Sequence, residues 1–245
     1  MSYRTDGTSG KDQVVIGVLM LASGPPFRLP GCAVSEDTYS FQMKRRIVKG
    51  ATVSRMTSDS SDLLAPILEA AGELEGDGVD AIMGNCGFMA IFQDVLRQKV
   101  SVPVFTSSLL LVPLVAGMLP KGKRIGILTY KAPTLTETHY LGAGWSSKDV
   151  PIAVACVQDK PAWRLFMTPE HPFHEENLRR ELLSVCDDFV AGHPDLGALV
   201  LECTAMPPFA HTIHARFGLP VFDISTLAAL VADSLSRKAF QRRQA

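Results

Sequence analysis

The sequence predicts an α/β protein of two similar lobes, each built on a parallel sheet and related by a pseudo-two-fold axis, with a ligand cleft between them. Three observations lead to this fold. Short strands that are apolar throughout alternate with amphipathic helical segments, as in βαβ units. The same order of segments occurs twice along the 245 residues. Each copy also contains a strand that ends in a cysteine, and parallel sheets bind ligands beyond the carboxyl ends of their strands.

The composition is typical of a globular chain. Residues of the A, V, I, L, M, F, W, Y, C set make up 47% and charged residues 20%, which is enough to build a core. The net charge of −1 argues against nucleic acid or an anionic membrane as a partner. Five cysteines without a C-x-x-C pair argue against a disulfide framework or a zinc ribbon, so we expect a cytoplasmic protein.

The two copies of the repeat open on similar strands. Val15–Leu19 and Arg124–Thr129 are short and rich in branched apolar residues, which suits strands buried on both faces. An amphipathic helix follows in each copy, with an apolar stripe over residues 63–74 in the first and 178–190 in the second. Glycine-containing breakers end both helices.

Each copy then contains a second buried strand that ends in a cysteine, Val79–Cys86 and Leu196–Cys203. A helical segment comes next, and after it a short strand preceded by proline. Pro103 and Pro220 each stand 17 positions after the cysteine of their copy. The cysteines are 117 positions apart but the opening strands only 109, so the second copy should hold about eight additional residues, in a loop over 160–174.

The repeat predicts where each lobe begins and ends. We expect the first lobe at residues 14–116 together with 223–245, and the second lobe at residues 117–222. Residues 1–13 are polar and are expected to form a disordered lead-in. Because ligands bind beyond the carboxyl ends of the strands, Cys86 and Cys203 should lie on opposite walls of one cleft.

These two matched cysteines are the predicted catalytic residues. A thiolate acts as a base or a nucleophile, and the unpaired N–H groups of a helix start favour its negative charge. Cys86 is followed by Gly87, where a ligand can approach the backbone, and Cys203 by a helix expected to start near Pro207. The other cysteines have no counterpart in the repeat and are interpreted as packing residues: Cys32, Cys156 and Cys186.

Both cysteine segments resemble those of the aspartate/glutamate racemase superfamily. The stretch Glu202–Phe209, ECTAMPPF, is similar to the second-cysteine motif Cys-Thr-x-x-Pro of that superfamily. Gly84–Phe88, GNCGF, with Gln93 resembles the first-cysteine motif of an uncharacterised branch, and Val102–Leu109 resembles the same branch. The resemblance covers nearly the whole chain, from about residue 14 to residue 232.

The resemblance implies a racemase or isomerase that needs neither pyridoxal phosphate nor any other cofactor, nor a metal ion. Its substrate would be a small carboxylate such as an amino acid or a hydantoin-like compound. One thiolate would remove the proton α to the carboxylate, and the other thiol would donate a proton to the opposite face. The predicted substrate-binding residues are Asn85, Gly87, Thr204, Ser107, Thr129 and Ser23. We also expect a homodimer or a higher homo-oligomer.

The chain departs from the glutamate racemases of this superfamily at two supporting positions. The loop over 21–24 has no acidic residue, and Ala205 stands where those enzymes carry a histidine. Arylmalonate decarboxylases keep one of the two cysteines, so the presence of both disfavours their reaction. Three alternatives stay open: a maleate-isomerase-like enzyme with one covalent cysteine, a decarboxylase-like enzyme, and a non-catalytic module that binds a small molecule.

Overall fold

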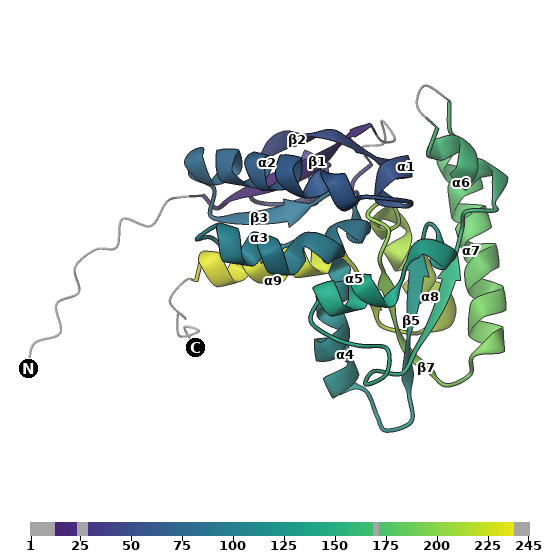
Figure 1. The fold of residues 1–245 in the computed structure, drawn as a ribbon. Coiled ribbons are helices and arrows are strands. Elements are labelled where there is room, and N and C mark those ends of the chain that lie inside the picture. Colours follow the sequence, from purple (N-terminus) through teal and green to yellow (C-terminus); the bar gives the residue numbers. More distant parts are fainter. Residues whose placement is uncertain (1–12, 24–28, 169–171, 238–245) are drawn as a thin grey trace, which may run out of the picture.

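The computed structural model describes residues 13–23, 29–168 and 172–237, and these form two four-stranded parallel sheets (Figure 1). The first sheet has the order β2-β1-β3-β4, with β1 (Val15–Ser23), β2 (Gln42–Thr52), β3 (Ala81–Gly84) and β4 (Val104–Phe105). The second has the order β6-β5-β7-β8, with β5 (Arg124–Thr129), β6 (Ile152–Cys156), β7 (Leu196–Leu201) and β8 (Val221–Phe222). The matching orders confirm the predicted α/β fold.

Helices connect the strands of both sheets. The α-helices are α1 (Val53–Met56), α2 (Leu64–Gly76), α3 (Gln93–Lys99), α4 (Val112–Met118), α5 (Glu137–Gly142), α6 (Pro161–Phe166), α7 (Glu175–Gly192), α8 (Ala210–Phe217) and α9 (Ile224–Leu235). Short 3-10 segments are η1 (Glu36–Thr38), η2 (Ser61–Leu63), η3 (Gly87–Phe92), η4 (Ser108–Leu111), η5 (Ala132–Thr134) and η6 (Pro207–Phe209).

The apolar opening strands lie in the middle of their sheets. β1 pairs with β2 and β3, and β5 pairs with β6 and β7, all in parallel. Ile16 and Val18 of β1 and Ile127 and Leu128 of β5 have no exposed surface. Strands rich in branched residues occupy this position because both of their faces are covered.

The structure also contains elements that the sequence did not predict. The prediction passes from each opening strand directly to a helix, whereas the structure inserts the edge strands β2 and β6. β2 carries the cluster 44–46 of basic residues, and its Arg46 forms ion pairs with Glu73 and Asp77 at 3.0 and 2.6 Å. The predicted loop over 160–174 is wrong in part, because α6 forms there and buries Trp163 and Phe166.

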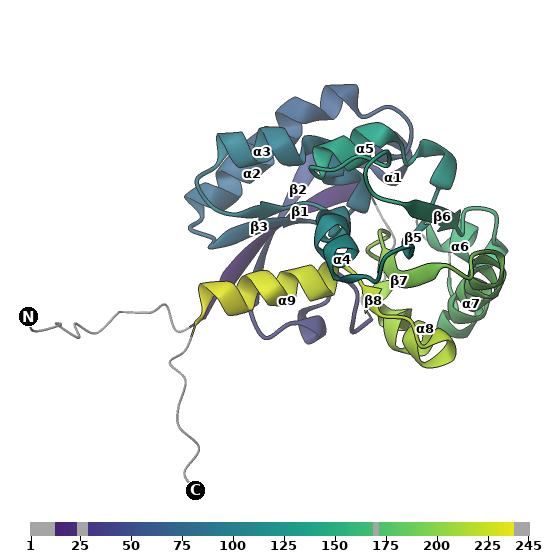
Figure 2. The same ribbon diagram turned by 90° about the horizontal axis from the view of Figure 1, so that it is seen from below.

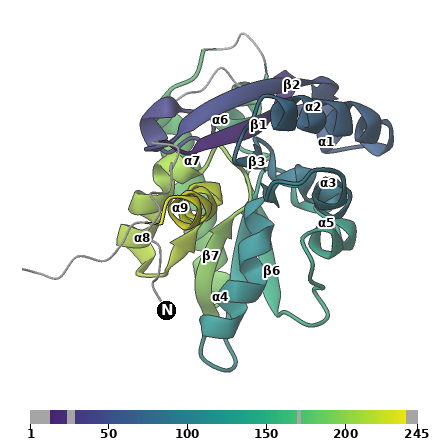
Figure 3. The same ribbon diagram turned by 90° about the vertical axis from the view of Figure 1, so that its left-hand side faces the viewer.

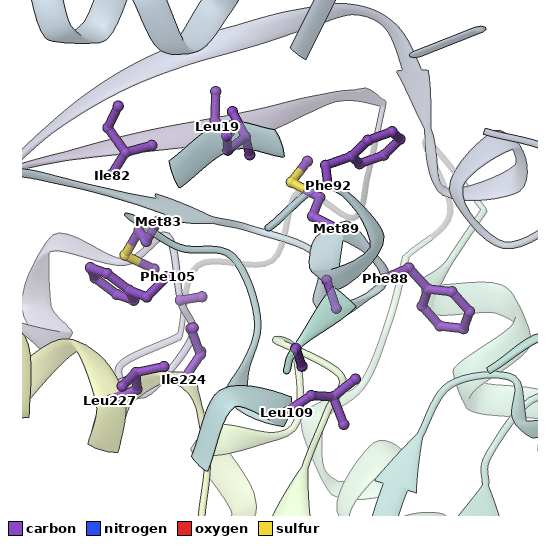
Figure 4. Close-up of a cluster of buried hydrophobic side chains, with 14 of the residues drawn as sticks. Leu19, Ile82, Met83, Phe88, Met89, Phe92, Phe105, Leu109, Ile224 and Leu227 are labelled. Atoms are coloured by element: carbon purple, nitrogen blue, oxygen red, sulfur yellow. The ribbon is translucent and has the colours of Figure 1, made fainter. Parts of the chain in front are cut away.

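Each sheet is covered on one face by a helix from the other copy of the repeat. α9 follows β8 of the second sheet, yet it lies against the first sheet on the face opposite α2 and α3 (Figure 2). Figure 4 shows Ile224 and Leu227 of α9 below Met83 and Phe105 of the first sheet. Correspondingly, α4 follows β4 of the first sheet and lies against the second (Figure 3).

A second connection between the copies is made by α5. This helix follows β5 of the second sheet but packs on η3 of the first, where a Cβ at Gly142 would overlap the carbonyl of Ala90. The ring of His139 meets that of Phe88 edge-on, with centroids 4.9 Å apart. The Nε1–H of Trp145 donates to the carbonyl of Leu109 in η4 at 2.9 Å. The two sheets are therefore joined by packing as well as by the chain.

The predicted lobe boundaries, 14–116 with 223–245 and 117–222, stay a prediction. The packing of α9 agrees with assigning residues 223–235 to the first lobe, whereas α4 begins before residue 116 and contacts β5. Apart from Gln13, the predicted lead-in lies outside the described residues. None of the helices in the described ranges is long and apolar enough to cross a membrane.

Candidate active site

The two predicted catalytic cysteines occupy corresponding positions in the two sheets. β3 ends at Gly84 and β7 at Leu201, so each cysteine is the second residue beyond its strand. Burial and then the charge of Glu202 raise the pKa of Cys203 most, and the charge of Cys86 adds to them because the two thiols lie near each other. The structure thus brings one cysteine from each copy of the repeat into a shared site.

Backbone amides reach both thiols from the helical turns that follow them. Burial and the charge of Glu202 raise the pKa of Cys86, the N-cap residue of η3, whereas the backbone N–H groups of Phe88 and Met89 act to lower it. The N–H of Ala205 acts on Cys203 in the same sense, against burial and Glu202. Such amides favour a thiolate or another anion.

Hydrogen bonds between the copies hold the two cysteine segments together. The hydroxyl of Thr204 donates to the carbonyl of Asn85 at 2.6 Å. The hydroxyl of Ser108 donates to the carbonyl of Leu201 at 2.8 Å. Within the first sheet, Oδ1 of Asn85 accepts a 3.0 Å bond from the N–H of Leu21. These bonds set the position of each cysteine relative to the other.

A buried glutamate stands between the two cysteine segments. Glu202 is 1% exposed, and its Oε2 accepts a 2.6 Å hydrogen bond from the hydroxyl of Thr129. Among the described residues, its Oε1 has no hydrogen-bond partner. A Cβ at Gly87 would overlap both that Oε1 and the carbonyl oxygen of Glu202. Glu202 therefore occupies the space that a side chain at position 87 would need.

The electrostatics of the site oppose thiol ionisation. Burial, followed by the charge of Glu202, raises the pKa of Cys86 to about 12 and that of Cys203 well above its usual value. Burial raises the pKa of Glu202 itself to about 7, against the hydrogen bond from Thr129 that lowers it. Three acidic groups thus share one desolvated space.

Most of the predicted substrate-binding residues lie near the thiols but already make protein hydrogen bonds. The hydroxyls of Thr129 and Thr204 donate to Glu202 and to Asn85. The hydroxyl of Ser107 accepts from the N–H of Leu109 at 3.2 Å, which caps η4. Ser23 ends β1, and its side chain lies outside the described part of the structure. Their contact with a substrate stays a prediction.

Sequence reasoning missed three residues at this site. Glu202 was read only as part of a motif, although a carboxylate at the end of an otherwise apolar strand is a signal in itself. Tyr130 follows β5, and charge on Cys203 raises its pKa after the larger effect of burial. Cys32, interpreted as a packing residue, belongs to the same buried cluster as Cys203, and the N–H of the next residue, Ala33, donates to the carbonyl of Thr204 at 3.4 Å.

A cavity of about 450 Å³ lies between the two copies beside Tyr130. It is lined by Val53, Ser54, Thr57, Tyr130, Lys131, Gln158, Asp159, Arg164, Met167 and Thr168. The first three come from α1 and the residue after it, and the rest follow β5 and β6. Tyr130 lines this cavity and, after burial, the charge of Cys203 raises its pKa, whereas neither Cys86 nor Cys203 is among the lining residues. Across the described ranges, His, Cys, Asp and Glu residues form no group of three that could hold a metal ion.

Comparison with known sequences identifies relatives along most of the chain. A profile of the family described as Asp/Glu/Hydantoin racemase matches residues 43–232. A dimethylsulfoniopropionate lyase of Durusdinium sp. clade D is 30% identical over 203 residues, which are 80% of this chain and 66% of that enzyme. Dimethylsulfoniopropionate lyase 5 of Emiliania huxleyi is 32% identical over 222 residues, 81% of this chain and 43% of that enzyme. The chain thus spans less than two thirds of these curated relatives.

Solved structures share the fold at low sequence identity. Allantoin racemase from Klebsiella pneumoniae superposes with a TM-score of 0.59 at 19% identity, covering 91% of this chain and 87% of that one. A Gly74Cys mutant of arylmalonate decarboxylase gives 0.62 at 16% identity, covering 94% and 97%. Such similarity extends the fold assignment over almost the whole chain.

Proposed function

Because this chain belongs to the Asp/Glu/hydantoin racemase family, we propose that it is an enzyme that moves a proton at the carbon α to a substrate carboxylate, with Cys86 and Cys203 as its acid/base groups. The observation that supports this most directly is the meeting of the two thiols, each presented by the same turn of its copy of the repeat. Two acid/base groups on opposite walls fit a carbon held between them.

The surroundings fit a small carboxylate as the substrate. The backbone amides that follow each cysteine supply donors for a carboxylate or for the enolate-like charge that develops when the α-proton leaves. The neighbouring cavity is lined by Lys131 and by Arg164, which pairs with Asp159 at 3.7 Å, and by Tyr130, whose pKa burial and then the charge of Cys203 raise. We propose that the substrate enters through this cavity.

Two outcomes follow from the same first step. If the second thiol donates a proton to the opposite face, the substrate is racemised. If the β-carbon carries a leaving group, the electron pair of the broken C–H bond forms a C=C bond and the group departs. For dimethylsulfoniopropionate, the products would be acrylate and dimethyl sulfide, and the proton would remain on the cysteine.

The curated relatives favour elimination as a specific second candidate. Both relatives that reach 30% identity are named dimethylsulfoniopropionate lyases, whereas the racemases are similar in fold at below 20% identity. Elimination needs one base, while racemisation needs an acid and a base. The pair of thiols suits both reactions, so the two candidates differ in how many cysteines turnover requires.

Proton exchange and product analysis test the proposal. The chain would be incubated in heavy water with dimethylsulfoniopropionate, allantoin and a panel of amino acids and hydantoins. Gas chromatography would follow dimethyl sulfide, and mass spectrometry would follow deuterium at the α-carbon. For racemisation, Cys86→Ala and Cys203→Ala should each lower turnover at least about 10³-fold, and for elimination only one of them should. Absence of both deuterium uptake and elimination with every compound would contradict the proposal.

A further inference from the structure

Glu202 and Asn85 are equivalent positions of the repeat, since each directly precedes the cysteine of its copy. Their side chains are used differently. Asn85 turns back to its own sheet and accepts from the N–H of Leu21 at 3.0 Å. Glu202 is bonded by Thr129 of its own sheet through one oxygen, while its other oxygen lies over Gly87 of the opposite copy. The side chain of Glu202 therefore reaches the opposite copy of the repeat, whereas the side chain of Asn85 stays within its own copy.

The position of this carboxyl places it beside both thiols at once. Gly87 follows Cys86 and Glu202 precedes Cys203, so the contact between Gly87 and Glu202 brings the carboxyl to the ends of both cysteine segments. Space for it exists because residue 87 has no side chain. The Oε1 that faces Gly87 has no partner among the described residues, which leaves a proton-binding atom enclosed in the site.

We propose that Glu202 controls the cysteine pair as a positioning residue: either thiol ionises readily only while the Glu202 carboxyl holds its proton, so that the three groups together carry one negative charge. The inference deepens the proposed function, because it concerns the same two thiols. In this proposal, one carboxyl group determines how readily both Cys86 and Cys203 ionise.

The electrostatics support this assignment. The Glu202 carboxylate raises the pKa of both Cys86 and Cys203, and among the causes that act on these two thiols no lysine or arginine of the described residues offsets it. Two like charges in one desolvated space oppose each other strongly. Since burial raises the pKa of Glu202 to about 7, its charge appears at a lower pH than that of either thiol.

The titratable groups that face Glu202 come from three elements. Cys86 approaches from the end of β3, Cys203 from its own segment, and Tyr140 from α5, where burial and then the Glu202 charge raise the pKa of the phenol. Thr129 of β5 contributes an uncharged donor. All three titratable neighbours are acids, so ionisation of any one of them makes the others harder to ionise.

The rate of thiol alkylation reports thiol ionisation and requires no turnover. The inference about Glu202 can therefore fail or hold independently of whether the proposed reaction is found. The intact protein would be treated with iodoacetamide from pH 6 to pH 11, and Cys86 and Cys203 followed by mass spectrometry of their peptides. In Glu202→Gln, the pH profile of alkylation should shift to lower pH by about one unit for both thiols, so that at pH 9 both are alkylated about tenfold faster than in the wild type. Glu69→Gln, at an exposed position on α2, should match the wild type.

Two further variants keep the test decisive. Glu202→Asp retains a carboxyl and should keep the slow alkylation of the wild type. Thr129→Val removes the donor that lowers the pKa of Glu202, so the charge should appear at higher pH and alkylation between pH 7 and 8 should accelerate. If Glu202→Gln does not fold, Thr129→Val carries the test. Unchanged alkylation rates in either Glu202→Gln or Thr129→Val would overturn the inference.

Discussion

The hydroxyl of Thr204 donates a 2.6 Å hydrogen bond to the carbonyl oxygen of Asn85, so the residue after one cysteine is bonded to the residue before the other. This bond joins the two copies of the repeat at the place where their thiols meet. It gives the threonine that follows Cys203 a structural role at the site.

Loss of this bond should weaken the contact between the copies. Thr204→Val removes the donor and leaves the carbonyl of Asn85 unsatisfied, which we expect to lower the free energy of unfolding by about 1–2 kcal/mol. Urea denaturation measures the change. Thr134→Val is a suitable control, because its hydroxyl bonds only to the nearby carbonyl of Lys131, and it should cost less than about 0.5 kcal/mol. Equal losses in the two variants would contradict the prediction.

A side chain at position 87 should disrupt the site. The Cβ of Gly87→Ala would overlap the carboxyl and the carbonyl oxygen of Glu202, and since the carbonyl belongs to the backbone it cannot move aside alone. We expect a loss of about 1–3 kcal/mol in unfolding free energy, and loss of turnover with any substrate found.

The matched control is Gly72→Ala, also a glycine-to-alanine change. Gly72 lies within α2, and a Cβ there meets nothing within 4 Å. It should raise the unfolding free energy by about 0.5–1 kcal/mol, because alanine favours the helix. A Gly87→Ala protein as stable as Gly72→Ala would show that position 87 has room for a methyl group.

The buried carboxyl should make stability depend on pH. Folding raises the pKa of Glu202 from 4.5 to about 7, mainly through burial, so its contribution to stability is fully present below pH 4.5 and is lost as the pH rises through about 7. Between pH 5 and pH 8, the unfolding free energy of the wild type should fall by about 2–3 kcal/mol more than that of Glu202→Gln. Guanidinium denaturation at both pH values tests this, and parallel pH dependences would exclude a buried titrating carboxyl.

The cap of α9 should be important because this helix covers the first sheet. Asp223 is 3% exposed and accepts from the N–H groups of Ser225 and Thr226 at 2.8 and 3.1 Å. Asp223→Ala should lower the melting temperature and cost about 1–2 kcal/mol. Asp233→Ala, on the exposed side of the same helix, should stay within about 0.5 kcal/mol of the wild type. Equal melting temperatures for the two variants would show that the Asp223 cap does not contribute to stability.

The repeated pattern made the architecture and the cysteine pair predictable from sequence. Strand–helix order and the 117-residue spacing place Cys86 and Cys203 at equivalent strand ends, and the structure contains both strands and the turns that follow them. The edge strand β2 was harder to predict, because one side of it faces water and its residues 44–46 are basic. A half-exposed edge strand lacks the uniform apolar run by which a central strand is identified.

The arrangement around Glu202 could not be predicted from one sequence. Its bond to Thr129 joins residues 73 positions apart, and its contact with Gly87 crosses between the copies. Local patterns identify strands and helix starts, but they carry no information on which side chain fills the space left by a distant glycine. The roles of Asn85 and Thr204 as structural partners were hidden for the same reason.

Because α4 packs on the second sheet and α9 on the first, neither half of the chain contains all the helices that cover its own sheet. If the chain were cut between residues 119 and 123, each fragment would expose one sheet face to water and would hold the helix that belongs on the other fragment. Folding of either half therefore depends on the other, and the two sheets should melt in one cooperative transition. The same interlock should limit how far the two sheets can move apart by hinge motion.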